Sequence, residues 1–161
     1  MGFLDKLFVK PVYSIFSPLS GKTVPITDVP DRAFSEGMLG HGIAIDPIEG
    51  SVYAPCDGTI DMVFTTGHAI SLIADFGAEI LIHVGLESAR IDSNLFTVYV
   101  KNGDPVKKGQ LILQVDLAAM KTAGMNTLTP VIVCNADDYS NFKAFTGKHV
   151  TTEDVIIQLR K

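Results

Sequence analysis

The sequence predicts an all-β protein, an antiparallel β-sandwich with a few short helical turns. Its 161 residues include 14 glycines and 8 prolines, which recur often enough to interrupt most long helical periods. The stretches between them are short, apolar or alternating, and of strand length, as in sandwiches and barrels. Helical patterns are scarce. Frequent turns and short strands together therefore indicate a β-sandwich.

The predicted elements follow one another without a linker or a low-complexity segment, and the length fits one domain with its own core. Strands are expected at residues 23–26, 43–45, 51–54, 59–64, 69–73, 80–84, 96–100, 111–115, 131–133 and 155–159. Short helices are expected at residues 31–37 and 116–123. Asp31 and Asp116 would cap them, because an aspartate can accept hydrogen bonds from the free amides of a first turn.

Two strand–turn–strand phrases refine the fold class to the barrel-sandwich hybrid type. They occupy residues 53–60 and 100–110. In the second phrase Gly103 and Gly109 flank a turn, and Lys107 and Lys108 keep an outer edge charged. Such phrases describe the scaffold and say little about function.

Composition excludes several classes of function. The formal charge of −5, without a basic stripe, argues against a nucleic-acid partner. No apolar run reaches the roughly 20 residues of a membrane span. Cys56 and Cys134 lie far apart without metal-ligand spacing, which indicates two free thiols in a reducing compartment. We therefore expect a cytoplasmic protein.

We expect residues 1–13 to be a flexible segment in front of a domain that covers residues 14–161. Apolar side chains at positions 3, 4, 7 and 8 have helical spacing, but the segment is too short to be a stable helix in water. Two interpretations stay open. Residues 2–8 are a frayed terminus, or they form a surface helix on lipid and make a weak membrane contact.

Residues 66–87 carry the clearest chemical signal, a predicted hairpin with one histidine on each strand. Asp75, Phe76 and Gly77 lie between the strands, where a short loop is expected. If Asp75 and Phe76 form a two-residue loop, His68 lies directly opposite His83. If Phe76 and Gly77 form it, the two histidines are diagonal neighbours on the same face. A three-residue loop without a bulge would place them on opposite faces. Two facing imidazoles could carry a proton, a metal or a phosphoryl group.

Several separate motifs, in order and over about residues 14–160, resemble the glucose-family enzyme IIA of the bacterial phosphoenolpyruvate-dependent sugar phosphotransferase system. The matching segments are residues 17–21, 28–31, 34, 40–45, 54–60, 66–68, 83–86 and 127–131. The resemblance implies an antiparallel β-sandwich. It also implies a phosphoryl carrier that receives its group from the phosphocarrier HPr and passes it to a cysteine of a IIB domain.

The resemblance also implies the roles of the site residues. His83 would be the nucleophile, attacking through Nε2 while the carbonyl of Gly85 holds Nδ1–H. His68 would stabilise the phosphoryl oxygens, and the Thr66 hydroxyl would orient His68. No cofactor or metal is required, although His68 and His83 could share a zinc ion with a partner carboxylate.

Around the histidines the resemblance implies a partner-binding apron with an acidic edge. The apolar positions are Phe34, Leu39, Phe64, Leu81 and Ala89, and the acidic positions are Asp31 and Glu87. An exposed apolar patch with charges at its edge suits transient docking with several partners. Arg32 departs from the family pattern, because this position is normally apolar.

Three alternatives stay open. A biotin or lipoyl carrier domain would be modified at Lys121 within residues 118–121. A metallohydrolase would use His41 together with His68, His83 and a carboxylate. A regulatory relative of the same fold would bind permeases or kinases and transfer little phosphate. The sequence does not identify the sugar.

Overall fold

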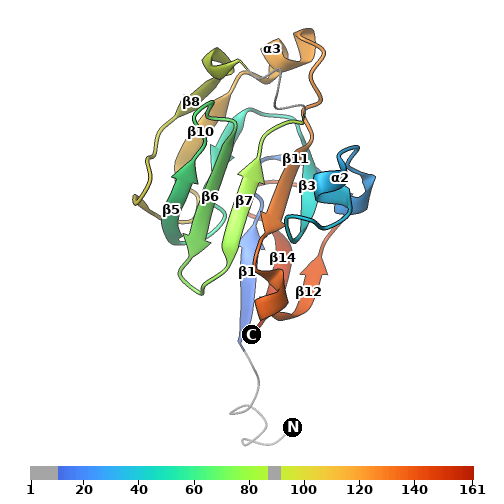
Figure 1. Cartoon of the computed structure of the whole chain (residues 1–161), viewed down its shortest axis with the longest axis vertical. Coiled ribbons are helices and arrows are strands. Elements are labelled where there is room, and N and C mark those ends of the chain that lie inside the picture. The colour runs from blue at the N-terminus through green and yellow to red at the C-terminus, as the bar shows by residue number, and fades with distance from the viewer. Residues whose placement is uncertain (1–10, 87–91) are drawn as a thin grey trace, which may run out of the picture.

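The computed structural model describes residues 11–86 and 92–161, which fold into three antiparallel sheets (Figure 1). The strands are β1 (Val12–Phe16), β2 (Gly21–Pro25), β3 (His41–Pro47), β4 (Ser51–Tyr53), β5 (Gly58–Val63), β6 (Ala69–Ala74), β7 (Glu79–His83), β8 (Phe96–Val98), β9 (Pro105–Val106), β10 (Leu111–Val115), β11 (Thr129–Val133), β12 (Ser140–Ala144), β13 (His149–Val150) and β14 (Val155–Arg160). The helices are α2 (Arg32–Ser35), α3 (Leu117–Thr122) and the 3-10 turns η1 (Ile26–Asp28), η3 (Ser93–Leu95) and η4 (Ala136–Asp138).

The largest sheet has eight strands in the order β13-β2-β3-β11-β7-β6-β5-β9. Two three-stranded sheets, β4-β10-β8 and β1-β14-β12, complete the sandwich. This arrangement confirms the predicted antiparallel β-sandwich of the barrel-sandwich hybrid type. Among the described residues, no helix has the length and apolar character to cross a membrane.

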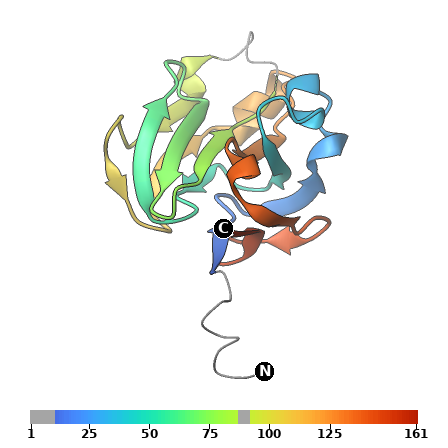
Figure 2. The ribbon, with the colours of Figure 1, turned by 60° about the horizontal axis from the view of Figure 1, so that its bottom comes forward.

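Each predicted strand overlaps an observed one, but β1, β9, β12 and β13 were not predicted. β1 also corrects the expected domain start, because Val12 and Tyr13 already pair with Arg160 and Leu159 of β14. Figure 2 shows the C-terminus beside this first strand. This pairing joins residues near the two ends of the sequence, so no local sequence pattern predicts it. Residues 2–8, where a surface helix was considered, lie outside the described residues.

The β6–β7 hairpin contributes one face to the core. Ile70 and Leu72 pair with Ile82 and Ile80, and each of these four side chains is at most 1% exposed. They join a cluster that also contains buried residues of β1, β10 and β14. Burial of such a side chain stabilises the fold by about 1.5–3 kcal/mol, so the register of this hairpin is strongly fixed.

A proline inside the large sheet is accommodated by the ladder around it. Pro130 of β11 pairs with Ala44 of β3. The ladder between β11 and β7 begins only at Val131, so Pro130 has a strand partner on one side alone. A proline donates no backbone hydrogen bond, and this is the kind of edge position where a sheet tolerates one.

Both helix caps were predicted correctly. The Asp31 side chain accepts a hydrogen bond of 3.0 Å from the Ala33 amide at the start of α2. The Asp116 side chain accepts one of 3.0 Å from the Ala119 amide at the start of α3. Figure 1 shows α2 beside β3, and α3 at the end of the molecule toward which β7 points.

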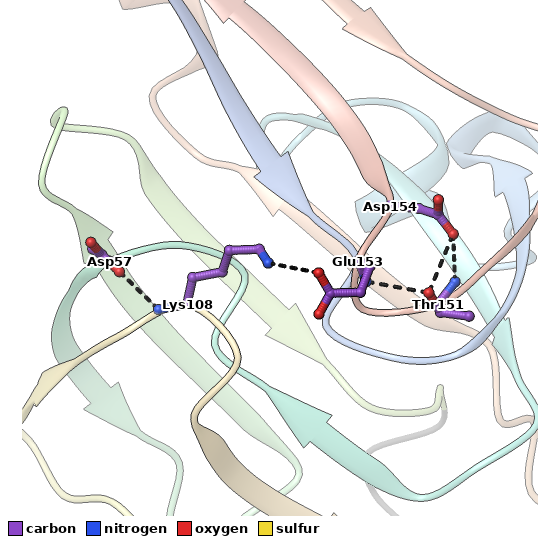
Figure 3. A network of polar contacts seen from close by, with 5 residues as sticks. All are labelled: Asp57, Lys108, Thr151, Glu153 and Asp154. Carbon is purple, nitrogen blue, oxygen red and sulfur yellow. Dashed lines mark hydrogen bonds and ion pairs between the residues drawn. The ribbon is translucent and has the colours of Figure 1, made fainter.

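Exposed polar contacts connect the turn before β10 with the loop before β14 (Figure 3). The Lys108 amide donates to an Asp57 carboxylate oxygen at 2.9 Å, and Nζ of Lys108 lies 3.5 Å from a Glu153 oxygen. Nζ also lies 4.1 Å from the centroid of the Phe16 ring. Exposed ion pairs stabilise by about 0–1 kcal/mol, so this network adjusts the loops rather than determining the fold.

Candidate functional site

The two histidines of the hairpin meet at its open end. His83 is the last residue of β7, and His68 directly precedes β6. The centroids of the two imidazole rings lie 4.8 Å apart, with the ring planes at 81°. His68 is buried, with 6% of its surface exposed, and His83 is partly buried. The structure thus brings together the two residues that the sequence singled out.

The hairpin loop has three residues, the case for which strict alternation predicts opposite faces. Ala69 pairs with His83 and Ile73 with Glu79, and the Ala74 amide donates to the Ala78 carbonyl at 2.9 Å. Ala74 and Ala78 therefore close the hairpin, and the loop between them consists of residues 75–77. The rings nevertheless meet, because His68 lies in a bend just before β6, where alternation no longer fixes the direction of a side chain, although its carbonyl still accepts from the Val84 amide at 2.8 Å. The proximity of the two histidines is therefore a property of the hairpin end, and the register alone would not produce it.

The ring of His83 is oriented by the backbone of the next turn. Its Nδ1 lies 2.7 Å from the carbonyl oxygen of Gly85. A carbonyl can only accept, so Nδ1 carries the proton and Nε2 keeps its lone pair. Gly85 has φ +77°, a conformation that glycine adopts without strain. The result is a partly buried imidazole with a nucleophilic nitrogen.

The ring of His68 is oriented by Thr66. The Thr66 hydroxyl oxygen hydrogen bonds Nδ1 of His68. Thr66 lies in a tight turn, in which the Gly67 amide donates to the Phe64 carbonyl at 2.7 Å. Gly67 has φ +81°, and a Cβ on it would come within 3.1 Å of Phe96 and Val98 of β8. The glycine therefore allows the turn that contains Thr66 and His68 to pack closely against β8.

Burial keeps both imidazoles neutral. Desolvation, assisted by the neighbouring His83, lowers the pKa of His68 from 6.5 to about 4. Desolvation also lowers the pKa of His83, against opposing contributions from the Gly85 carbonyl and the Asp31 carboxylate. At neutral pH the site therefore presents two uncharged rings, one with a free lone pair and one able to donate a hydrogen bond.

The predicted apron divides into exposed and buried members. Leu39 and Phe64 are 42% and 36% exposed, as a docking surface requires. Leu81 is partly buried and packs against the cluster that contains Phe34. Phe34 itself is only 3% exposed, and its ring centroid lies 5.2 Å from that of His83, at an angle of 61°. The structure therefore places Phe34 beneath the histidine, where it offers a partner little surface.

The acidic edge is described only in part. Asp31 is partly exposed. Burial lowers the pKa of His83, and the charge of Asp31 acts to raise it, which indicates a carboxylate near this ring. Arg32 points its largely exposed side chain to Glu36, with Nε 2.9 Å from a carboxylate oxygen. Glu87 and Ala89 lie outside the described residues, so their predicted partner contacts stay predictions.

Phe96 is a member of the site that the sequence did not reveal. Its side chain is 9% exposed, and its ring centroid lies 6.4 Å from that of His68. The sequence predicted a strand at this position, but no local signal indicates that the strand abuts the histidine. Together with Phe64, whose ring centroid lies 5.6 Å from that of His68, it gives the imidazole an aromatic surround.

The structure does not favour the two rival chemistries. Lys121 is an exposed residue of α3 and not the tip of a hairpin, where a biotin or lipoyl domain carries its lysine. His41 lies near Asp137, with Nε2 3.7 Å from a carboxylate oxygen. Within residues 11–86 and 92–161, no group of three His, Cys, Asp or Glu residues is placed to hold a metal. A zinc pair at His68 and His83 remains a prediction that needs a partner's carboxylate.

Comparison with known proteins agrees with this geometry. Residues 13–139 match the family described as phosphoenolpyruvate-dependent sugar phosphotransferase system, EIIA 1. A beta-glucoside-specific EIIBCA component from Dickeya chrysanthemi is 41% identical over 146 residues, which cover 91% of this chain and 23% of that protein. A protein of the same description from Bacillus subtilis (strain 168) is 44% identical over 126 residues, or 78% of this chain and 21% of the relative.

The chain thus spans about a quarter of the length of these curated relatives. Among solved structures, the glucose permease IIA from Mycoplasma capricolum superimposes with a TM-score of 0.82 at 27% identity. That comparison covers 98% of this chain and 99% of the other. The paired histidines, the sandwich and the match over residues 13–139 agree: the chain belongs to the EIIA family of the phosphoenolpyruvate-dependent sugar phosphotransferase system.

Proposed function

We propose that this chain carries a phosphoryl group on Nε2 of His83, between phospho-HPr and a cysteine of a IIB domain, during sugar uptake. The observation that carries the proposal is the hydrogen bond of 2.7 Å between Nδ1 of His83 and the Gly85 carbonyl. It leaves Nε2 as the nucleophilic nitrogen, close to the second imidazole of the site. Family membership supports the reaction class, and this geometry supports Nε2 of His83 as the reacting atom.

In the first transfer, the lone pair on Nε2 of His83 attacks the phosphorus of the donor. A phosphorus–nitrogen bond forms, and the bond between phosphorus and the donor atom breaks, with its electron pair returning to the donor. Nδ1 keeps its proton, and the Gly85 carbonyl stabilises the positive charge that develops on the ring. In the second transfer, a thiolate of the IIB domain attacks phosphorus, and the electron pair of the bond to Nε2 returns to His83.

His68 stabilises the charge on the transferring group. If the Thr66 hydroxyl donates to Nδ1 of His68, the neutral ring carries its proton on Nε2 and can donate it to a phosphoryl oxygen. The buried, aromatic surroundings strengthen this hydrogen bond, because little water competes for it. The lowered pKa of His68 makes this donor a neutral imidazole at neutral pH.

The relatives and the exposed surface support the choice of partners. Relatives named EIIBCA combine several components in one polypeptide, so a IIB domain is the acceptor that we propose. HPr is the proposed donor, docking over the exposed Leu39 and Phe64 beside Asp31. Since both relatives are named beta-glucoside-specific, a β-glucoside is the sugar to test first. The resemblance leaves a purely regulatory role as the alternative outcome.

The direct test is incubation with phosphoenolpyruvate, enzyme I and HPr, followed by intact mass measurement. The wild type should gain one phosphoryl group that is labile in acid and stable in base. His83→Gln should gain none, and His41→Gln, an exposed histidine outside the site, should behave as wild type. A phosphate retained on the His83→Gln variant would overturn the assignment. No gain on the wild type would leave the regulatory role.

A further inference from the structure

We infer that Met120 and Asn126, in the segment formed by α3 and the turn after it, are positioning residues for His83. They act through Gly85, whose carbonyl holds the proton on Nδ1 of the histidine. The inference rests on the proposed function for its consequence in transfer, but the contacts that carry it are independent of that function. Three residues, Val84, Gly85 and Leu86, form the turn that follows β7, and contacts on both sides of this turn hold it in place.

The first contact is a packing contact behind Gly85. A Cβ placed on this glycine would come within 2.7 Å of Met120 Cε and within 3.1 Å of the Asn126 carbonyl oxygen. Met120 is fully buried in α3. The methionine methyl group therefore fills the space into which the Gly85 backbone would otherwise relax.

The second contact is a pair of hydrogen bonds on either side of Gly85. The Val84 amide donates to the His68 carbonyl at 2.8 Å, and the Leu86 amide donates to the Asn126 carbonyl at 3.0 Å. The peptide that carries the Gly85 carbonyl includes the Leu86 amide. Because one end of that peptide plane is fixed by Asn126, its other end points the oxygen at Nδ1 of His83.

The third contact fixes Asn126 itself. Its side-chain Oδ1 accepts a hydrogen bond of 3.0 Å from the Leu128 amide. The Met125 amide bonds the Met120 carbonyl at 3.0 Å, which joins α3 to the same turn. Asp116 caps this helix, and Figure 1 shows α3 at the end of the molecule where β7 finishes. Helix, turn and glycine therefore form one connected support for the histidine.

Such a support matters because glycine is permissive. At φ +77° the backbone of Gly85 can rotate to other conformations at little cost. If the Gly85–Leu86 peptide rotates, Nδ1 of His83 loses its acceptor, and the proton is free to move to Nε2. A protonated Nε2 has no lone pair and cannot attack phosphorus. The positioning residues thus control the fraction of molecules that hold the reactive tautomer.

The test compares Met120→Ala with Met120→Leu and Met125→Ala. Met125 is a second buried methionine of the same turn, and its side chain is not among the described atoms within 4 Å of a Cβ placed on Gly85. The ¹⁵N-labelled, unphosphorylated chain is examined by long-range ¹H–¹⁵N NMR of the histidine rings. Met120→Ala should move the Nδ1 signal of His83 toward the unprotonated position and the Nε2 signal toward the protonated one. Met120→Leu, which conserves volume, and Met125→Ala should retain the wild-type tautomer.

The kinetic readout is phosphorylation by phospho-HPr. Met120→Ala should lower kcat roughly tenfold to hundredfold while KM for phospho-HPr stays unchanged, because the ring is misplaced and the docking surface is intact. Asn126→Ala removes the bond to Leu128 from a partly exposed position, and it should shift the tautomer in the same direction. This second variant serves if Met120→Ala does not fold.

A wild-type tautomer in both Met120→Ala and Asn126→Ala would overturn the inference. So would an equal tautomer shift in Met125→Ala, because the effect would then be general loosening. The proposed function can fail separately. If phospho-HPr does not phosphorylate the wild type, but the tautomer shifts as described, the carrier role is lost and the positioning role stands.

Discussion

His68 and His83 meet at their rings although the register of β6 and β7 assigns them to opposite faces of the sheet. His83 pairs with Ala69, so continued alternation would direct His68 with Ile70 toward the core. β6 begins only at Ala69, and residues 67 and 68 form a bend that is still joined to β7 by the hydrogen bond from the Val84 amide to the His68 carbonyl, so the His68 side chain does not follow the alternation of the strand. The ring centroids are consequently 4.8 Å apart.

This arrangement predicts separate effects on the two halves of the reaction. His68→Gln removes a hydrogen-bond donor but leaves the nucleophile, so HPr should still phosphorylate the variant on His83. Onward transfer to a IIB domain should slow by roughly 10²–10³-fold, the cost of one oxyanion-type donor. Quenched-flow measurement of each step distinguishes them. Equal loss in both steps would contradict the role given to His68.

Thr66→Ala should show a milder form of the same defect, because the Nδ1 partner of His68 is lost while the ring remains. Thr66→Ser keeps the hydroxyl and is the matched control. Onward transfer should therefore fall in Thr66→Ala and recover in Thr66→Ser. If Thr66→Ser is as slow as Thr66→Ala, the methyl group is the important part of Thr66, and the hydrogen bond is not.

The lowered pKa of His68 predicts a dependence of stability on pH. In the unfolded chain the imidazole takes up a proton near pH 6.5, whereas in the folded protein its pKa is lowered to about 4. The contribution of the neutral His68 ring to the stability of the fold is thus fully present above pH 6.5, and it is lost as the pH falls through about 4. At about 1.4 kcal/mol per pH unit, it amounts to roughly 3 kcal/mol at most.

Urea unfolding at several pH values measures this contribution of His68 to the free energy of unfolding. The free energy of unfolding of His68→Gln should fall less than that of the wild type between pH 6.5 and 4. The comparison between the two proteins removes the carboxylate contributions, which they share. His41→Gln, at a more exposed position, is the control. An identical fall in wild type and His68→Gln would show that the buried imidazole titrates normally.

Phe34 was predicted to offer contact area to partners, and its burial revises that prediction. Phe34→Ala should cost about 3–5 kcal/mol in unfolding free energy, as for other buried phenylalanines. Phe34→Leu should remain folded and lower kcat of phosphorylation, since the packing against His83 is altered, with KM for phospho-HPr little changed. A raised KM with an unaltered kcat would restore Phe34 to the docking surface.

Docking should instead depend on the exposed members of the apron. Phe64→Ala should speed dissociation of HPr with little change in salt dependence, because it removes desolvated contact area. Asp31→Asn should weaken binding and flatten its dependence on salt, because exposed charge pairs set the encounter rate. NMR titrations of HPr at several salt concentrations measure both. Asp75→Asn, at the opposite end of the hairpin, removes the same charge and should have no effect.

The sequence by itself determined the fold class, six of the eight strands of the main sheet, both helix caps and the identity of the two histidines. These follow from local rules: strand alternation, turn residues at their places, and aspartates in front of helical turns. The motif around His83 also located Gly85 as the acceptor of Nδ1, through its resemblance to a known family. Strands, turns and helix caps depend on residues that are close in the sequence, so each can be predicted from a short segment of the chain.

Only the tertiary structure decided which residues surround these groups. Phe34 lies beneath His83, Phe96 lies beside His68, and Met120 lies behind Gly85, and each comes from an element separate from the hairpin. β1 likewise depends on a partner strand at the other end of the chain. Long-range packing depends on how all the sheets close at once, because a buried side chain is stabilised by neighbours that no short stretch of sequence specifies.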